Sequence, residues 1–273
     1  MSNLFRRHTT IDVSGQKFEE PLTINFEVPF DDTTELNTAS VEIYNLSDST
    51  IKNMKKKQPV TIQSGYKDDR GVIFEGIVEK ATTSRDGVDK LTKIDLVDDA
   101  GGKWTEEKLK KTYKGPIDAK TILADLMPRV GLAIGDFKLP KNHVYKKGKT
   151  VNGLISKSIK AIAKDCNAKV HINKKKLFVR DKGKADPYAI IVNKDTGLIG
   201  SPTPIESEES SPDGEEKKAV SGWKVTMLLN HRVSTDSTLS IKSKTANGQF
   251  RVTAGKHMEN GDSFYTECDV YPL

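Results

Sequence analysis

The chain has 273 residues, a formal net charge of +6 and a mean hydropathy of −0.55. This length is near the size at which one hydrophobic core tends to divide, so we expect two or three domains. No apolar run approaches the roughly 18 residues of a membrane-spanning helix, and no apolar stretch of a signal peptide follows the N-terminal arginines. Two isolated cysteines, Cys166 and Cys268, exclude a disulfide framework and favour folding in a reducing cytoplasm.

Charge is distributed unevenly along the chain. Residues 1–102 hold 13 Lys and Arg against 18 Asp and Glu, a net charge of −5. Residues 103–184 hold 22 against 7, a net +15, and residues 185–273 hold 9 against 13, a net −4. A basic block between two acidic ones predicts three domains over these ranges. The pI near 9 therefore comes from one segment and does not by itself indicate nucleic-acid binding.

Residues 1–102 show the pattern of short β-strands. The run 22–28, LTINFEV, alternates apolar and polar residues, and similar stretches recur as far as residue 97. Asp86-Gly87 lies between two of these stretches and predicts a hairpin turn. Ser47 is placed to cap a short helix over 48–57. Five or six strands in about a hundred residues favour a small barrel or sandwich.

Residues 103–184 change to a mixed pattern. Apolar residues at 119, 122, 123 and 126 form one helical stripe, with Asp118 near its cap and Pro128 ending it. A longer amphipathic helix is expected after Thr150, with lysines on its polar face. Residues 169–180 indicate a hairpin that turns at Lys174-Lys175. This segment is therefore expected to form a compact α+β unit.

Residues 185–273 return to strand patterns. The run 223–229, WKVTMLL, alternates, and three later stretches follow as far as residue 270. Asn247-Gly248 and Asn260-Gly261 stand where hairpin turns are needed. Residues 201–221 are rich in Ser and Pro and hold six acidic residues against two lysines. We predict that they form a mobile, solvated, acidic loop.

A weak internal repeat links the two β segments. The sequence VTIQS at 60–64 resembles LSIKS at 239–243, and each is followed by a Gly-led strand. A turn glycine comes next in both, with an aspartate eight residues after it, Asp95 or Asp269. Any two hairpins can share such features, so chance similarity is the alternative. A true repeat predicts two similar β-domains flanking one α+β insert.

We find no constellation of catalytic or metal-binding residues. Gly148-Lys149-Thr150 resembles the end of a phosphate-binding loop, but His143 stands where that loop needs glycine. The acid pairs Asp31-Asp32 and Asp98-Asp99 are chain neighbours whose side chains would point to opposite faces of a strand, so we expect turn residues. None of the five histidines has metal-ligand spacing to another His or Cys. We therefore predict a non-enzymatic protein without catalytic, cofactor-binding or metal-binding residues.

The lysines of residues 103–184 are the remaining candidate for binding. Lys174-Lys175-Lys176 lies at the expected hairpin turn, and Lys146, Lys147 and Lys149 precede the expected longer helix. Such a cluster can attract an acidic partner, nucleic acid or another anionic polymer. A solvated surface is the alternative interpretation. Few aromatic residues stand among these lysines, which argues against stacking on single-stranded bases.

Several stretches of both β segments resemble one family of known proteins. VEIYNL at 41–46, the helix after it and GVIFEG at 71–76 are similar to the first domain of phage tail hub proteins. That family includes hubs of contractile-tail baseplates, of prophage-derived tail particles and of long non-contractile tails. Later stretches of this chain resemble the second β-domain of the family and follow in the expected order. They are GLIGSP at 197–202, KVTMLLN at 224–230 and GQFRVTAG at 248–255 with His257.

The resemblance implies a structural role. Hubs of this family are homotrimers in which each chain contributes two tube-like β-domains, so three chains form a pseudo-sixfold ring that joins the tail tube to the spike or tip. The implied partners are a tail tube or distal tail protein, the spike or tip protein, the tape measure protein and other baseplate proteins, with DNA passing through the lumen. The implied location is the tail tip of the virion, after assembly in the host cytoplasm and without stable membrane insertion.

The expected fold is mainly β with an α+β insert. Two small β-barrel-like tube domains, residues 1–102 and 185–273, flank an α+β domain of residues 103–184, whose lysines face neighbouring baseplate proteins. The chain ends at Leu273, just after the second β-domain, so we expect no appended peptidase, lysozyme or receptor-binding region. The alternative functions are a nucleic-acid or anionic-polymer binding protein and a tail-associated cell-wall hydrolase.

Overall fold

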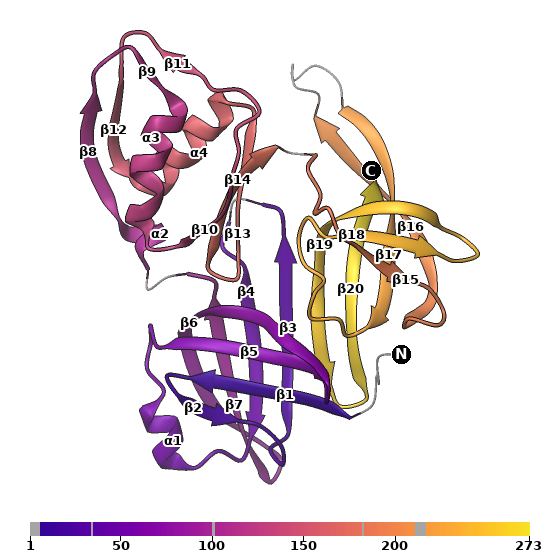
Figure 1. The fold of residues 1–273 in the computed structure, drawn as a ribbon. Helices are drawn as coiled ribbons and strands as arrows, with labels where there is room; N and C mark the ends of the chain where they lie inside the picture. Colours follow the sequence, from indigo (N-terminus) through magenta and orange to yellow (C-terminus); the bar gives the residue numbers. More distant parts are fainter. Residues whose placement is uncertain (1–5, 34, 100–101, 182, 211–216) are drawn as a thin grey trace.

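The computed structural model describes residues 6–273 except 34, 100–101, 182 and 211–216, with the backbone alone for 207–210 and 217–219. Figure 1 shows a first β region at the bottom, a part with most of the helices at the upper left and a second β region on the right. The predicted fold class, mainly β with an α+β insert, is confirmed.

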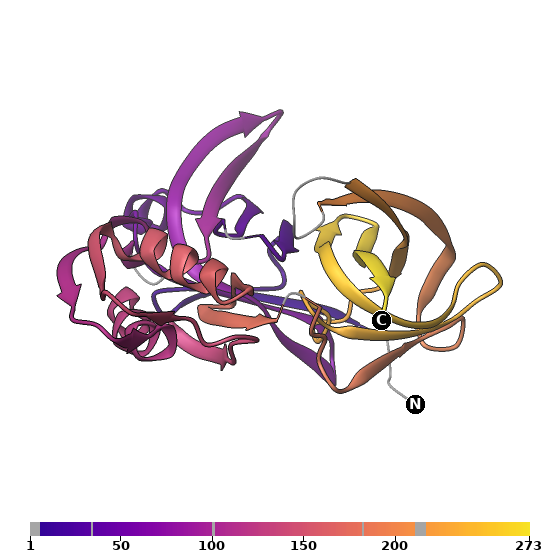
Figure 2. The same cartoon turned by 90° about the horizontal axis from the view of Figure 1, so that it is seen from above.

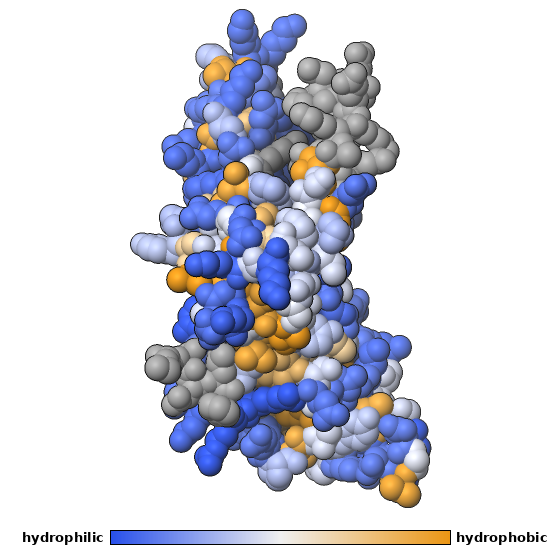
Figure 3. Space-filling model, turned by 90° about the vertical axis from the view of Figure 1, so that its right-hand side faces the viewer, coloured by the Kyte–Doolittle hydropathy of each residue, from blue (hydrophilic) through white to orange (hydrophobic). Residues whose placement is uncertain are grey.

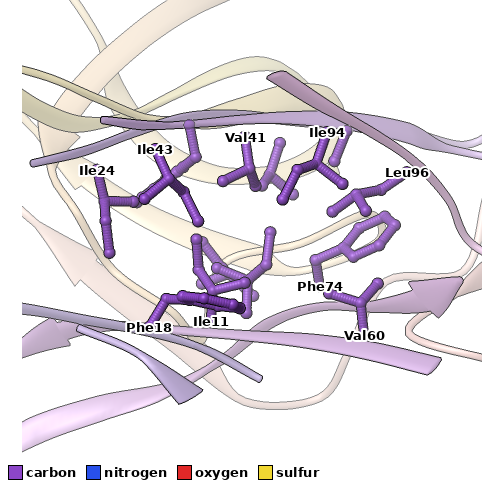
Figure 4. Close-up of a cluster of buried hydrophobic side chains, with 14 of the residues drawn as sticks. Ile11, Phe18, Ile24, Val41, Ile43, Val60, Phe74, Ile94 and Leu96 are labelled. Carbon is purple, nitrogen blue, oxygen red and sulfur yellow. The ribbon is translucent and has the colours of Figure 1, made fainter. Parts of the chain in front are cut away.

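Alternating hydrophobic residues build the first β region. In β3 (Ile24–Asp31) and β4 (Thr38–Tyr44) every second side chain is buried, because successive side chains of a strand point to opposite faces. The buried side chains pack into one core, which Figure 4 shows between the facing strands. The remaining strands of this region are β1 (Arg7–Val13), β2 (Gln16–Phe18), β5 (Pro59–Tyr66), β6 (Asp69–Asp86) and β7 (Asp89–Val97).

Local signals place the turns and caps of this region. Gly87, with φ of +62°, lies in the tight turn between β6 and β7, which confirms the predicted hairpin. Ser47 caps α1 (Asp48–Asn53), and its hydroxyl accepts a hydrogen bond of 3.2 Å from the Thr50 amide. The helix ends at Asn53, before Lys55, Lys56 and Lys57, which the predicted range 48–57 placed in its last turn.

The middle part is the predicted α+β unit, with a separate core. Asp118 caps α3 (Ala119–Leu126), as predicted, and the longer helix α4 (Ile155–Asp165) packs beside it. This second helix begins later than expected, because residues 149–154 form a strand instead. The other elements are α2 (Lys103–Glu106), β8 (Lys108–Tyr113), β9 (Ile117–Asp118), η1 (Met127–Val130), β10 (Ala133–Phe137), β11 (Val144–Tyr145), β12 (Lys149–Leu154), β13 (Ala168–Asn173) and β14 (Lys176–Asp181).

The second β region contains the largest departure from the predictions. The prediction of a mobile acidic loop over 201–221 is wrong for the described residues. Here β16 (Leu198–Ser210) and β17 (Lys217–Leu228) pair as antiparallel strands. Main-chain hydrogen bonds need no apolar side chain, so a polar composition did not reveal this pairing. Residues 211–216 of that prediction lie outside the described residues. The other strands are β15 (Ala189–Val192), β18 (Thr238–Lys242), β19 (Asn247–Asn260) and β20 (Ser263–Pro272).

The two β regions have the same strand order. The first runs β3-β4-β7-β6-β5-β1, and the second runs β16-β17-β20-β19-β18-β15. The four pairings among the first five strands are antiparallel in both regions. Only the last pairing differs, since β1 is antiparallel to β5 whereas β15 is parallel to β18. The predicted internal repeat is therefore confirmed in topology.

One pairing joins the two β regions. The second half of β19 runs antiparallel to β3, from Ala254 opposite Asp31 to Glu259 opposite Phe26. The main sheet therefore continues from one β region into the other and, among the described residues, has 13 strands. We call the β3–β19 pairing the internal seam.

Candidate functional site

The continuous sheet presents a polar face on the side away from the two cores. Side chains directly opposite each other in an antiparallel register share a face, so the pairing assigns each residue to one side. We define the polar sheet face by the charged residues that these registers place together. Its acids are Glu27, Asp31, Glu42, Asp86, Asp89, Asp95, Glu267 and Asp269, and its cations are Lys80, Lys93, Lys224, Arg251 and Lys256.

Carboxylates outnumber cations on the polar sheet face, eight against five. Lys224 Nζ lies 2.9 Å from an Asp269 carboxylate oxygen, and Lys256 Nζ lies 3.6 Å from Glu27. These pairs neutralise part of the charge within the second β region and across the internal seam. The face therefore keeps a net negative charge over both β regions.

The internal seam is closely packed around one histidine. His257 is fully buried on β19 opposite Val28, and its Nδ1 lies 2.8 Å from the Thr266 hydroxyl. Burial lowers the pKa of His257 to about 3, so the ring is neutral near pH 7. A Cβ on the neighbouring Gly255 would lie 2.7 Å from the Phe30 ring, so only glycine fits this close approach of the two strands.

Polar contacts at the strand ends also hold the two β regions together. Arg232 binds Asp69 with an Nη1–Oδ2 distance of 2.9 Å, and this pairing lowers the pKa of Asp69. Arg7 donates from Nη1 to the main-chain oxygen of Gly261 at 2.9 Å, in the turn between β19 and β20. Thr9 donates to Glu259 at 2.6 Å. These contacts and the internal seam fix one orientation of the second β region on the first.

A buried ion-pair cluster joins all three parts of the molecule. Asp236 is 1% exposed and accepts hydrogen bonds from Arg180 Nη2 at 2.6 Å and Arg251 Nε at 2.8 Å. Lys169 Nζ lies 3.4 Å from Asp236 and 2.6 Å from Asp32. Burial alone would raise the pKa of Asp236, but the surrounding cations outweigh it and hold the pKa below its ordinary value. We call these five residues the Asp236 cluster.

The lysine hairpin tip makes packed contacts through Lys174 and Lys175, whereas the sequence left open an exposed binding surface or a solvated one. The main-chain amides of Lys174 and Lys175 donate to the buried Asp98 carboxylate at 2.9 and 2.8 Å. Both lysines have positive φ, 50° and 55°, as the predicted two-residue turn requires. Lys174 Nζ also donates to the main-chain oxygen of His231 at 3.2 Å, and burial lowers its pKa to about 8. The tip therefore anchors the α+β part to both β regions.

Asp98 predicts a specific pH dependence of stability. Burial raises its pKa to about 7, against the two amide hydrogen bonds that favour the charged form. Between about pH 4 and pH 7 the unfolded chain releases this proton while the folded chain retains it, so rising pH removes the stability that this carboxyl contributes.

In urea unfolding from pH 4.5 to 7, the wild-type free energy of unfolding should therefore fall relative to that of Asp98→Asn, by at most about 1.4 kcal/mol per pH unit. The difference between the two proteins isolates Asp98 from the buried histidines, whose lowered pKa values give the opposite slope. Parallel pH profiles would contradict the assignment.

The other sequence candidates lie apart from one another. Gly148 is in the turn before β12, and Lys149 and Thr150 lie on that strand, so they do not begin a helix that could hold phosphate. His171 is buried and its ring stacks on Phe178 with centroids 4.8 Å apart. Within the described residues, no group of three His, Cys, Asp or Glu is arranged to hold a metal ion. No described helix is both long and apolar enough to cross a membrane.

Several lysines of the basic block are engaged within the chain. Lys111 pairs with Asp125 at 2.8 Å, Lys149 lies 3.5 Å from Asp165 and Lys160 lies 3.4 Å from Glu35. On the second β region, the face drawn in Figure 3 is mostly hydrophilic with a hydrophobic area near its middle.

Sequence reasoning missed the Asp236 cluster, because its members are far apart in the chain and each looks like an ordinary surface charge.

Comparison with known proteins identifies the family of this chain. A family model described as baseplate hub gp41 matches residues 8–267. The chain belongs to the baseplate hub gp41 family. Members of this family are structural components of the phage baseplate, so the protein is a hub of the virion tail. The predicted resemblance to tail hub proteins is confirmed. No curated protein matches the sequence.

Solved structures of tail proteins share the fold of this baseplate hub. A tail protein from Neisseria meningitidis MC58 matches with a TM-score of 0.69 and 10% identity, covering 98% of this chain and 97% of that one. The 43 kDa tail protein of prophage MuSo2 from Shewanella oneidensis matches with a TM-score of 0.71 and 8% identity, covering 97% and 98%. The E. coli c3393 protein, a type VI secretion component, matches at 0.61 and 7%, covering 96% and 76%.

Proposed function

We propose that this baseplate hub assembles as a homotrimer whose six β regions form a pseudo-sixfold ring between the tail tube and the spike or tip. The supporting observation is that both β regions have one strand order and are joined edge to edge by the internal seam. A chain that already holds two copies of one unit, side by side in a shared sheet, presents two sixths of such a ring. The three domains in this proposal are residues 1–102, 103–184 and 185–273.

The polar sheet face lines the lumen of the proposed ring. Its carboxylates exceed its cations, so a phosphate backbone passing along it meets net repulsion rather than a row of positive charges. A tape measure protein and then DNA can pass such a surface without being retained. The α+β domain lies outside the ring, where its remaining exposed lysines face other baseplate proteins.

The experiment that tests this function is the mass of the protein, alone and with the tail tube and spike proteins of its own particle. Three chains of 30.2 kDa give a complex of about 91 kDa, which sedimentation or mass photometry resolves from a monomer. Electron microscopy should show a ring with an open centre. A chain that stays monomeric under all of these conditions contradicts the proposal.

The two alternative functions have their own readouts on the same preparation. Binding of DNA or heparin that weakens steeply with added salt, by a protein that does not assemble, would favour an anionic-polymer binding protein. Clearing of cell-wall material in a zymogram would favour a tail-associated hydrolase. For the ring, we expect neither signal.

A further inference from the structure

We propose that β16 of one chain adds to β6 of the next copy of this chain, antiparallel, with Thr203–Ser207 opposite Lys80–Ser84. The inference rests on the proposed trimeric hub and specifies the surfaces that close it. It follows from three observations on the internal repeat: the match between β6–β7 and β19–β20, the match between β3 and β16, and the edge that each strand leaves free.

The hairpins β6–β7 and β19–β20 match pair by pair with a constant offset of 174 residues. Ile77 is opposite Val97 in the first and Arg251 is opposite Tyr271 in the second. Both ladders are interrupted at one equivalent position, by a bulge after Val78 and a bulge after Val252. The match extends to side chains, because the Thr83–Thr92 hydroxyl contact of 3.2 Å occupies the place of the His257–Thr266 contact.

The strands β3 and β16 also occupy equivalent places. β3 pairs with β4, which pairs with β7, and β16 pairs with β17, which pairs with β20. In the first β region Glu27 lies opposite Ser40, and in the second Thr203 lies opposite Lys224. Ser40 and Lys224 pair in turn with the equivalent residues Asp95 and Asp269, so Glu27 and Thr203 occupy equivalent positions. Beyond the β16 irregularity at 199–203, the two strands then correspond residue by residue.

The internal seam shows what each equivalent surface binds. On β19, residues 254–259 lie beyond the end of β18, and that edge is covered by β3. On β6, residues 80–85 lie beyond the end of β5, and no strand of the described chain covers that edge. β16 is the terminal strand of the main sheet among the described residues, so one of its edges is free as well. Figure 2 shows the β6–β7 hairpin reaching away from the rest of the molecule.

Transferring the internal seam to these free edges sets the register between chains. The seam pair Ala254–Asp31 corresponds to Lys80 of one chain opposite Ser207 of the next. In the same way, the seam pair Met258–Glu27 corresponds to Ser84 opposite Thr203. The exposed sequence KATTSR at 80–85 holds Lys80 and Arg85 and no acid, whereas the paired stretch Thr203–Ser207 holds Glu206 and no cation. The charges are therefore complementary. Pro204 has no N–H, so the seam between chains has fewer donors than a ladder without proline, and an isolated pair of edges binds weakly.

A cysteine pair tests this register directly. Thr82 and Ile205 become opposite residues, at a separation that a disulfide spans, so Thr82→Cys/Ile205→Cys should give a covalent trimer under mild oxidation. A ring closed by three such bonds runs at the trimer position on a non-reducing gel and returns to monomer with reductant. The native Cys166 and Cys268 are buried and do not interfere.

The matched control is Val88→Cys/Ile205→Cys, because residue 88 lies about 20 Å further along the hairpin at strand spacing. This control should not cross-link at a comparable rate. A trimer by mass without the Thr82–Ile205 cross-link overturns the strand pairing and leaves the hub function in place. Equal cross-linking of both pairs overturns the register. A chain that never trimerises, with or without its tube and spike proteins, overturns both proposals.

Discussion

Asp236→Ala should lower the free energy of unfolding by about 3–5 kcal/mol, since it leaves a group of buried cations without their carboxylate. Arg180 and Arg251 each donate to Asp236, and Lys169 lies 3.4 Å from it. Asp32 touches only Lys169 and Arg251 among these, so Arg180 would lose its most buried acceptor. Urea unfolding followed by circular dichroism measures the loss.

The effect of Asp236→Ala should be largest where the cluster joins the α+β part to the β regions. Hydrogen exchange of β13 and β14 should rise more than that of β4 or β7, because the latter strands belong to a separate core. Asp262→Ala is the matched control, since Asp262 is exposed in the turn between β19 and β20. A loss below about 1 kcal/mol for Asp236→Ala would mean that the cluster contributes no more than a surface ion pair.

Gly255→Val should lower the free energy of unfolding by about 3 kcal/mol, because the internal seam has no space for a side chain at this position. A Cβ there would lie 2.4 Å from the Glu267 main-chain oxygen and 2.7 Å from the Phe30 ring. The main-chain atom cannot move without breaking the pairing of β19 with β20. Chemical unfolding measures the loss, and limited proteolysis should show that the two β regions separate more readily.

Ala81→Val is the matched control for the seam, because Ala81 occupies the position of Gly255 in the first β region. Its edge of β6 is uncovered in the single chain, so valine should cost less than about 0.5 kcal/mol there. Equal losses for the two variants would show that the position on the strand, rather than the seam, causes the effect of Gly255→Val.

Period-two alternation and turn chemistry were sufficient to predict much of the fold. The alternating run 22–28 became β3, the glycine of Asp86-Gly87 made its hairpin turn, and Ser47 capped its helix. These features depend on neighbours in the chain, so composition and spacing report them directly. The strand pairing over 201–221 depends on an adjacent strand instead, and a Ser-, Pro- and Glu-rich sequence hid it.

The lysine hairpin shows why the candidate site was harder to predict. Lys174-Lys175 was recognisable as a turn from spacing alone, and the positive φ angles agree. Its partner is Asp98, about 76 residues earlier in the chain, whose contact with both amides appears only when the α+β part packs on the first β region. A carboxylate in an adjacent acid pair gives no sign in the sequence that it will be buried.

Local residue patterns were enough to establish a mainly β chain with a mixed insert, an internal repeat and a resemblance to tail hubs. The tertiary structure alone showed that the two repeats share one sheet, that β3 pairs with the edge of β19 that β18 leaves uncovered, and that Asp236 binds cations from the α+β part and from its own β region. The reason is physical. Strand alternation and caps are set by residues a few positions apart, whereas edge pairing and buried charge clusters form between residues whose separation in sequence carries no information about their separation in space.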